Sequence, residues 1–272
     1  MLERLLPQIV ALSKRAGQAI MDIYAEPVQV VSPKADDSPL TQADIASDRV
    51  IHMGLLELGL GWPILSEETA QVAYDERKSW SRFWLIDPLD GTKEFISRNG
   101  EFTVNIALIE DGSPVLGVVY APALDVCYFS ARGIGAFIQR GTAPEQRIRV
   151  QPFVRPMKVV ASRSHTDART TELLDRLGVH EYISMGSSLK LCAVAEGVAH
   201  FYPRLAPTME WDTAAAHAVV SEADGIVCDL TGEELRYNKP NLLNSEFLVM
   251  SGRYDMLHTF NALLSQGSSS AT

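Results

Sequence analysis

Carboxylate side chains gather in one short segment of this 272-residue chain. The apolar run 83–86 leads directly into Asp87-Pro88-Leu89-Asp90-Gly91-Thr92. Pro88 fixes its own φ and has no N–H to donate, while Gly91 permits a backbone conformation that other residues avoid. Two carboxylates at the end of a buried strand need either exposure or a cation, and hard oxygen donors of this kind suit Mg²⁺. The segment therefore predicts a cation site at the end of a strand.

Two further acidic motifs follow apolar segments elsewhere in the chain. An expected strand over 63–65 ends in Ser66-Glu67-Glu68, and Glu210-Trp211-Asp212 stands where an alanine-rich helix is expected to begin. Taken singly, an Asp at a helix start is usually a cap, and a Glu-Glu pair usually faces solvent. The three motifs together favour one shared cation site.

The elements expected around these motifs indicate an α/β (α+β) protein. Apolar residues at steps of three and four predict a helix over 2–24, and a second helix is expected to begin at Thr41 as N-cap and to reach Gly59. Residues 1–150 thus form a first half, in which a mainly antiparallel sheet is backed by helices. Its strands are expected at 63–65, 83–86, 102–109, 115–120 and 126–130, with a hairpin turn at 111–114.

Residues 151–272 form the expected second half, which follows a connector over 141–156. Strand and helix alternate here, as is typical of an α/β layer. Neither half is expected to fold separately. The pattern predicts strands at 158–161, near 182 and at 201–202, helices at 167–177, 187–196 and 211–223, and then a last strand and helix.

Composition narrows the function classes. A net charge of −10, from 24 Lys and Arg against 34 Asp and Glu, argues against binding to nucleic acid polymers. No apolar run approaches the length of a membrane span, and the N-terminus lacks the features of a signal peptide. Cys127, Cys192 and Cys228 lie among apolar neighbours, which predicts buried thiols in a reducing compartment. We expect a cytoplasmic protein; peripheral association with the inner face of the membrane and a homodimer stay open.

The three acidic motifs resemble, in order and spacing, the signature of the Mg²⁺-dependent, lithium-sensitive phosphatases of the inositol monophosphatase superfamily. Pro39-Leu40-Thr41-Gln42-Ala43-Asp44 is similar to the family's segment near the N-terminus, so the resemblance covers nearly the whole chain. It implies a layered αβαβα fold and a metal-dependent phosphatase. One departure is Ala214-Ala215-Ala216, where the family commonly has Ala-Ala-Gly; the alanine should preserve the helix and slightly alter close packing.

Segments in the second half resemble the bacterial 3′(2′),5′-bisphosphate nucleotidases of this superfamily. They are Ser162-Arg163-Ser164-His165, Gly186-Ser187-Ser188-Leu189-Lys190 and Leu235-Arg236-Tyr237-Asn238-Lys239. This resemblance implies hydrolysis of the 3′-phosphate of adenosine 3′,5′-bisphosphate to give AMP. The related sulfate donor, 3′-phosphoadenosine 5′-phosphosulfate, stays open as a second substrate.

The superfamily resemblance also implies two or three Mg²⁺ ions. Glu67, Asp87 and the carbonyl of Leu89 would hold one ion, while Asp87, Asp90 and Asp212 would hold a second, with Asp87 bridging the two. Two such ions can clamp both the attacking and the leaving oxygen of an in-line displacement. The resemblance thus predicts that both halves of the chain supply metal ligands.

Further roles are implied around the scissile phosphate. Glu67 and Thr92 would orient and deprotonate the attacking water, and Asp44 would support Thr92 or a third, weaker ion. Backbone N–H groups of Gly91 and Thr92 would help to bind the phosphate at a helix start. The substrate would also lie against the metal ligands Glu67, Leu89, Asp90 and Asp212.

A second phosphate needs its own cation, for which Lys190 and Arg204 are the candidates; a solvated surface charge is the alternative for each. Ser187 could add a hydroxyl donor. His165 could approach the adenosine, although a lone His is more often structural.

Two other functions stay open. An inositol or sugar monophosphatase would keep the metal site and need no pocket for a second phosphate. A non-catalytic nucleotide-sensing scaffold would keep the fold, but it would have no reason to retain unpaired buried carboxylates, which destabilise a metal-free protein.

Overall fold

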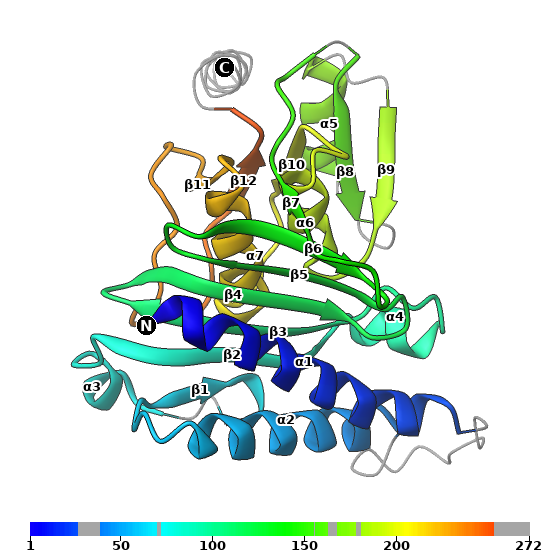
Figure 1. The fold of residues 1–272 in the computed structure, drawn as a ribbon. Coiled ribbons are helices and arrows are strands. Elements are labelled where there is room, and N and C mark those ends of the chain that lie inside the picture. The colour runs from blue at the N-terminus through cyan, green and yellow to red at the C-terminus, as the bar shows by residue number, and fades with distance from the viewer. Residues whose placement is uncertain (27–38, 70–71, 155, 163–167, 178–180, 253–272) are drawn as a thin grey trace.

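Helices and sheets alternate in five layers (Figure 1). The structure is a computed structural model and describes residues 1–26, 39–69, 72–154, 156–162, 168–177 and 181–252. The layered αβαβα fold expected from the sequence is confirmed. In order, the layers are helices α1 (Leu2–Tyr24) and α2 (Pro39–Glu57), a seven-stranded sheet, helices α6 (Leu189–Ala195) and α7 (Trp211–Glu222), a five-stranded sheet, and helix α5 (Ala168–Leu177).

The seven-stranded sheet follows chain order, and only its first two strands run parallel. A two-residue turn with positive φ at Asp111 and Gly112 joins β3 to β4, as the hairpin pattern predicts. The mainly antiparallel sheet expected for the first half is confirmed. Its strands are β1 (Ile64–Ser66), β2 (Arg82–Asp90), β3 (Thr103–Glu110), β4 (Ser113–Ala121), β5 (Val126–Ala131), β6 (Gly135–Arg140) and β7 (Gln146–Ile148).

Some boundaries differ from the sequence prediction. Strand β7 lies inside the segment expected as a connector. The sequence does not predict it, because a three-residue edge strand with two exposed positions shows no alternation of apolar and polar residues. Helix α2 begins at Pro39, so the prediction of Thr41 as its N-cap is wrong; proline suits the first turn of a helix, where its missing N–H has no partner. Short helices η1 (Glu67–Thr69), α3 (Tyr74–Arg77) and α4 (Thr92–Ile96) complete the first half.

The five-stranded sheet has the order β11-β12-β10-β8-β9. Strand β8 runs parallel to both its neighbours, whereas β12 runs antiparallel to both of its own. The expected strand and helix alternation therefore holds as far as β11, and the expected last helix lies outside the described residues. The strands are β8 (Lys158–Ser162), β9 (Glu181–Met185), β10 (Phe201–Arg204), β11 (Ile226–Asp229) and β12 (Phe247–Met250).

Helix α7 lies between the two sheets and is buried on nearly every side. Gly117 of β4 meets it so closely that a Cβ there would overlap the carbonyl oxygen of Ala215. Only glycine allows this approach. The close approach of Gly117 is thus to Ala215, and Ala216, where the family commonly has glycine, is fully buried within the helix.

Three apolar clusters fill the spaces between layers, and each holds one of the three cysteines. Cys127 lies where α1 and α2 cover the seven-stranded sheet, Cys192 lies around α6 and α7, and Cys228 lies between the five-stranded sheet and α5. Each is at most 1% exposed, and none forms a disulfide. Burial raises the pKa of the Cys127 thiol to about 12 and that of Cys192 well above its usual value. The prediction of buried thiols is confirmed.

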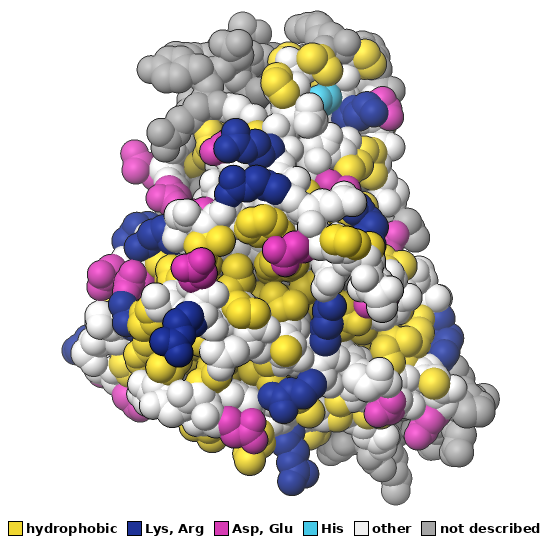
Figure 2. All heavy atoms as spheres, in the orientation of Figure 1, with side chains coloured by type: hydrophobic (Ala, Val, Ile, Leu, Met, Phe, Trp, Pro, Cys, Tyr) yellow, Lys and Arg dark blue, Asp and Glu magenta, His cyan; other side chains and the backbone are white. Residues whose placement is uncertain are grey.

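Charged side chains of both signs are interspersed over the visible face of the molecule, with no broad area of one sign (Figure 2). Among the helices of the described ranges, none has the length and apolar character needed to cross a membrane.

Candidate active site

A β-bulge in β2 arranges the two aspartates of the central motif. The strand continues through Pro88 to Asp90, and its register with β3 shifts by one residue between Asp87 and Asp90. In a regular strand, residues three apart point to opposite faces. The extra residue brings Asp87 and Asp90 to the same face of the strand. Bulges often redirect side chains in this way next to active sites. The turn is held by Leu89 N–H, which donates to Asp87 Oδ1 (3.1 Å), and by Ser47 Oγ, which donates to the Pro88 carbonyl (2.8 Å).

Glu67 and Asp44 come from neighbouring elements. Strand β1 runs parallel to β2 with Ser66 opposite Ile86, so Glu67 follows β1 at the level where Asp87 follows Ile86. Asp44 lies on α2, which packs against β2. Its Oδ1 is buried and accepts no hydrogen bond within the described part of the chain.

Asp212 enters the same region from the second half. It lies in the first turn of α7, and its Oδ2 accepts a hydrogen bond from Met209 N–H (2.8 Å). Burial, followed by the charge of Asp90, raises the pKa of Asp212 to about 7. The two aspartates therefore lie close enough to influence each other, although they are 122 residues apart in the sequence.

The other carboxylates also shift one another. Burial raises the pKa of Asp87 well above its usual value, and the charges of Asp90, Glu67, Asp212 and Asp44 add to the shift in that order. The pKa of Glu67 is raised by burial and by Asp90. Burial, with the nearby acidic side chains of η1, raises the pKa of Asp44 to about 8. The structure thus brings together the five acidic residues that the sequence predicts for the site.

These side chains supply only oxygen donors, which is the chemistry that Mg²⁺ prefers. An unpartnered buried carboxylate oxygen on Asp44 is the kind of group that a cation or its water shell can satisfy. As the side chains stand, no three His, Cys, Asp or Glu residues of the described ranges are arranged to hold one ion together.

A cavity of about 90 Å³ lies beside the acidic residues. Asp90 and Asp212 line it together with Ser187, Lys190 and Arg204, so the predicted substrate residues of the second half share one space with two predicted metal ligands. Pockets for whole ligands usually measure roughly 300–1,000 Å³. The cavity thus suits a phosphate-sized group, and the rest of a nucleotide would lie at its mouth.

Lys190 is buried, so the alternative prediction of a solvated surface charge is wrong for this residue. It is 9% exposed, and its Nζ donates to the Ser187 carbonyl (2.6 Å) and lies 5.9 Å from the centre of the Tyr202 ring. Burial lowers the pKa of its amine, and the charge of Asp90 opposes that shift. A buried cation beside a carboxylate can recognise an anion in the cavity.

Arg204 and Ser187 shape the rest of the cavity. Arg204 is half-buried, and its guanidinium donates to the carbonyls of Ala206 (3.1 Å) and Pro207 (3.2 Å). Ser187 has a positive φ of 46°, which is unusual for a residue other than glycine and is often found at functional sites. Both residues were predicted from the sequence, and the strain at Ser187 was not.

Gly91 and Thr92 follow the bulge. Gly91 has a φ of 96°, and a Cβ there would lie 3.2 Å from the Cα of Phe102, so glycine is required. Thr92 begins α4 as expected and is exposed; this helix has only five residues, so its dipole is small. Among the described residues, no hydrogen bond joins Thr92 to Asp44.

A set of hydrogen bonds that the sequence does not predict joins the two halves of the chain near Asp90. Ser188 N–H donates to Asp90 Oδ2 (2.6 Å), and Ser188 Oγ donates to Asn105 Oδ1 (2.7 Å). Gly186 N–H donates to Glu101 Oε2 (2.8 Å). No local pattern marks these long-range pairs. His165, the predicted adenosine contact, lies outside the described residues.

Comparison with known proteins places this arrangement in a family. Residues 1–265 match the inositol monophosphatase family. Over 248 residues, the chain is 51% identical to the protein named 3′(2′),5′-bisphosphate nucleotidase CysQ of Salmonella typhimurium, covering 90% of this chain and 99% of that one. A nucleotidase of the same name from Haemophilus influenzae is 34% identical over 92% of this chain and 93% of its own.

Solved structures agree. CysQ from Bacteroides thetaiotaomicron, described as a bacterial member of the inositol monophosphatase family, has a TM-score of 0.81 and 42% identity, covering 88% of this chain and 94% of its own. An inositol monophosphatase from Anabaena has a TM-score of 0.76 at 24% identity, over 97% and 96% of the two chains, which shows a shared fold. The chain belongs to the inositol monophosphatase family.

Proposed function

We propose that this chain is a Mg²⁺-dependent phosphatase that removes the 3′-phosphate of adenosine 3′,5′-bisphosphate to give AMP and phosphate. The observation that carries the proposal is the cavity in which Asp90 and Asp212 meet Lys190 and Arg204. The acidic residues of the lining can hold cations, while its basic residues can bind a second phosphate. The names of relatives at about half identity over nearly their whole length support the same substrate.

The metal ligands remain as the sequence predicts them. Glu67, Asp87 and the Leu89 carbonyl would hold one ion, and Asp87, Asp90 and Asp212 would hold a second. Asp44, whose pKa is raised by burial and then by the charges of Glu68 and Glu67, would support a third. When bound, Mg²⁺ supplies a more acidic water and neutralises charge on the phosphate oxygens. Burial, followed by the charges of neighbouring carboxylates, raises the pKa values of Glu67, Asp87 and Asp212, and bound cations would offset both effects.

Side chains and backbone N–H groups of the chain activate the water and position the phosphate. Glu67 accepts the proton of the attacking water, and Thr92 orients that water through its hydroxyl group. Backbone N–H groups of Gly91 and Thr92 bind the scissile phosphate and orient it for in-line attack. Phosphoryl transfer needs positioning and charge stabilisation more than covalent chemistry, so no phosphoenzyme is expected.

Substrate choice depends on the second phosphate. Lys190 and Arg204 bind the 5′-phosphate in the cavity, Ser187 adds a hydroxyl donor, and His165 approaches the adenosine. A compound with a single phosphate, such as an inositol phosphate, leaves the buried Lys190 without its anion. The bisphosphate is therefore preferred, and 3′-phosphoadenosine 5′-phosphosulfate is a second substrate of the same site.

Phosphate release from a substrate panel tests the proposal. The panel contains adenosine 3′,5′-bisphosphate, 3′-phosphoadenosine 5′-phosphosulfate and inositol 1-phosphate, each measured with Mg²⁺, with Mg²⁺ plus Li⁺, and with excess chelator. We expect preference for the nucleotides, inhibition by Li⁺ as in the family, and no activity with chelator. Activity that persists with chelator would contradict the metal mechanism, and equal turnover of inositol 1-phosphate would contradict the nucleotide specificity.

A cytoplasmic location and a division into halves at residue 150 that do not fold separately stay predictions, and a homodimer stays open.

A further inference from the structure

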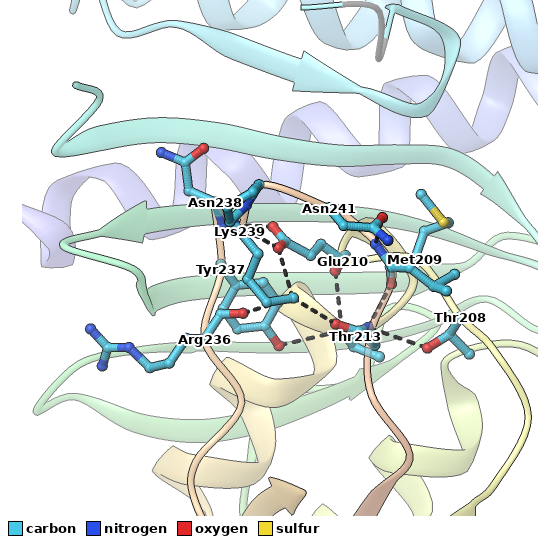
Figure 3. Close-up of polar contacts among 12 residues, drawn as sticks. Thr208, Met209, Glu210, Thr213, Arg236, Tyr237, Asn238, Lys239 and Asn241 are labelled. Carbon is cyan, nitrogen blue, oxygen red and sulfur yellow. Dashed lines mark hydrogen bonds and ion pairs between the residues drawn. The ribbon is translucent and has the colours of Figure 1, made fainter. Parts of the chain in front are cut away.

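Glu210 lies two residues before Asp212, and its side chain is completely buried. Its Oε2 accepts a hydrogen bond from Asn238 N–H (2.6 Å), while its Oε1 accepts one from Lys239 N–H (3.0 Å) and pairs with Lys239 Nζ (2.7 Å) (Figure 3). A buried carboxylate is stable only where it is paired and hydrogen-bonded. Both oxygens of Glu210 are thus engaged by the segment 238–239, so Glu210 is not itself a metal ligand.

The ion pair is connected to the residues on both sides of Asp212. Lys239 Nζ donates to Asn244 Oδ1 (3.2 Å), and Asn244 Nδ2 donates to the Met209 carbonyl (2.8 Å) and to Thr213 Oγ1 (3.1 Å). Met209 N–H in turn donates to Asp212 Oδ2 (2.8 Å). Figure 3 shows Met209, Glu210 and Thr213 gathered at the start of α7 against the segment that carries Lys239. The start of the helix is therefore fixed through Lys239.

The same segment is also held from the first half of the chain. Arg77 of α3 is 3% exposed, and its Nη1 donates to Asn238 Oδ1 (2.9 Å) and to the Lys239 carbonyl (2.6 Å), while its Nη2 donates to the Pro240 carbonyl (2.9 Å). Asn238 Nδ2 donates back to the Arg77 carbonyl (2.7 Å). Residues 238–240 thus lie between Arg77 on one side and Glu210 on the other.

We propose that Glu210, through its pair with Lys239, is a positioning residue that sets where Asp212 stands relative to Asp87 and Asp90. This inference rests on the proposed function, in which these three aspartates share a Mg²⁺ ion. Asp87 and Asp90 belong to the seven-stranded sheet and Asp212 to α7, so the shared site needs a fixed relation between sheet and helix. Outer residues that orient metal ligands in this way commonly govern metal affinity.

Glu210→Gln tests the inference because it keeps the shape of the side chain and removes its charge. Mg²⁺ binding is measured by titration calorimetry of the full chain without substrate, and phosphate release is measured over a range of Mg²⁺ concentrations. We expect the Mg²⁺ dissociation constant to rise about 10- to 100-fold, as for other outer residues of metal sites, and kcat at saturating Mg²⁺ to recover most of its value. Lys239→Met should also raise the Mg²⁺ dissociation constant. The double variant should bind Mg²⁺ no more weakly than Glu210→Gln does, because the two groups act as a pair.

Glu222→Gln is the matched control. Glu222 ends the same helix, and its carboxylate accepts hydrogen bonds from Gly133 N–H (3.1 Å) and Gly135 N–H (3.0 Å), far along α7 from Asp212. It should lower the melting temperature without changing the Mg²⁺ dissociation constant.

An unchanged Mg²⁺ dissociation constant in a folded Glu210→Gln protein would overturn the inference, as would an equal rise in Glu222→Gln. If Glu210→Gln does not fold, Lys239→Met carries the same test. Failure of the wild-type chain to bind Mg²⁺ or to release phosphate would instead overturn the proposed function.

Discussion

Lys190→Met tests whether the buried cation of α6 recognises the second phosphate. Methionine keeps a flexible, apolar side chain of similar length and removes the ammonium group. Although Lys190 is only 9% exposed, a side chain of similar length and apolar character should leave the packing of α6 largely intact. Any large change in activity then reports on the lost charge.

The expected magnitude follows from the hydrogen bonds of the ammonium group. An ammonium has three N–H donors, and within the described residues Lys190 Nζ makes one hydrogen bond, to the Ser187 carbonyl (2.6 Å). At least one donor is therefore available to an anion in the cavity shared with Arg204. A hydrogen bond to a charged group contributes about 1.5–3 kcal/mol, so its loss should lower kcat/KM for adenosine 3′,5′-bisphosphate about 10- to 150-fold.

The assay compares two substrates at saturating Mg²⁺. Adenosine 3′,5′-bisphosphate carries the second phosphate and adenosine 3′-monophosphate does not, so only the first should lose kcat/KM in Lys190→Met. Lys158→Met is the control, because it removes the same charge at a site that does not line the cavity. Lys158 lies on β8, is 44% exposed and pairs with Glu181 (3.6 Å). An equal loss for both substrates would refute the reasoning, since Lys190 would then act on Asp90 instead of on the second phosphate.

Three further outcomes are expected. Asp87→Asn should abolish phosphate release yet raise the melting temperature without metal, because it removes a buried charge from a group of like charges; a lower melting temperature would contradict this. Gly117→Ala should reduce the free energy of unfolding in urea by about 1–3 kcal/mol, because its methyl group meets the Ala215 backbone; a change no larger than that of Gly252→Ala, where the new methyl group has open space, would contradict it. Burial lowers the pKa of His217, and Glu234 opposes that shift. The unfolded chain therefore binds the extra proton first as pH drops through about 6.5, so the free energy of unfolding should fall. The urea midpoints of the wild type and of His217→Gln, measured between pH 5 and 8, should converge at low pH, and a constant difference between them would contradict this.

The chemistry of the site was more predictable than its geometry. The run from Asp87 to Thr92 predicts oxygen ligands at a strand end from residue types alone, because an apolar strand cannot use carboxylates otherwise. That Asp87 and Asp90 face the same way depends on the bulge, and a bulge is defined by the residues opposite it on β3. Sequence reasoning along one strand could not supply that partner.

The same distinction applies to the elements. Helix α1 and the strands β2 to β5 are long and strongly patterned, so the sequence predicts them well. The edge strand β7 is too short to show a period. Ser188 and Glu210 act through contacts with residues 98 and 28 positions away in the chain, and no local propensity encodes such contacts.

The distribution of cysteines gives this protein built-in probes of its unfolding. Alkylating reagents require an accessible, ionised thiol, and the native chain withholds all three sulfur atoms from solvent. Cys127 would become reactive when α1 and α2 separate from the large sheet, Cys192 when the centre opens, and Cys228 when α5 leaves the small sheet. Mass spectrometry of a chain labelled at increasing denaturant concentration would thus reveal the sequence in which the layers come apart, with no engineered reporter.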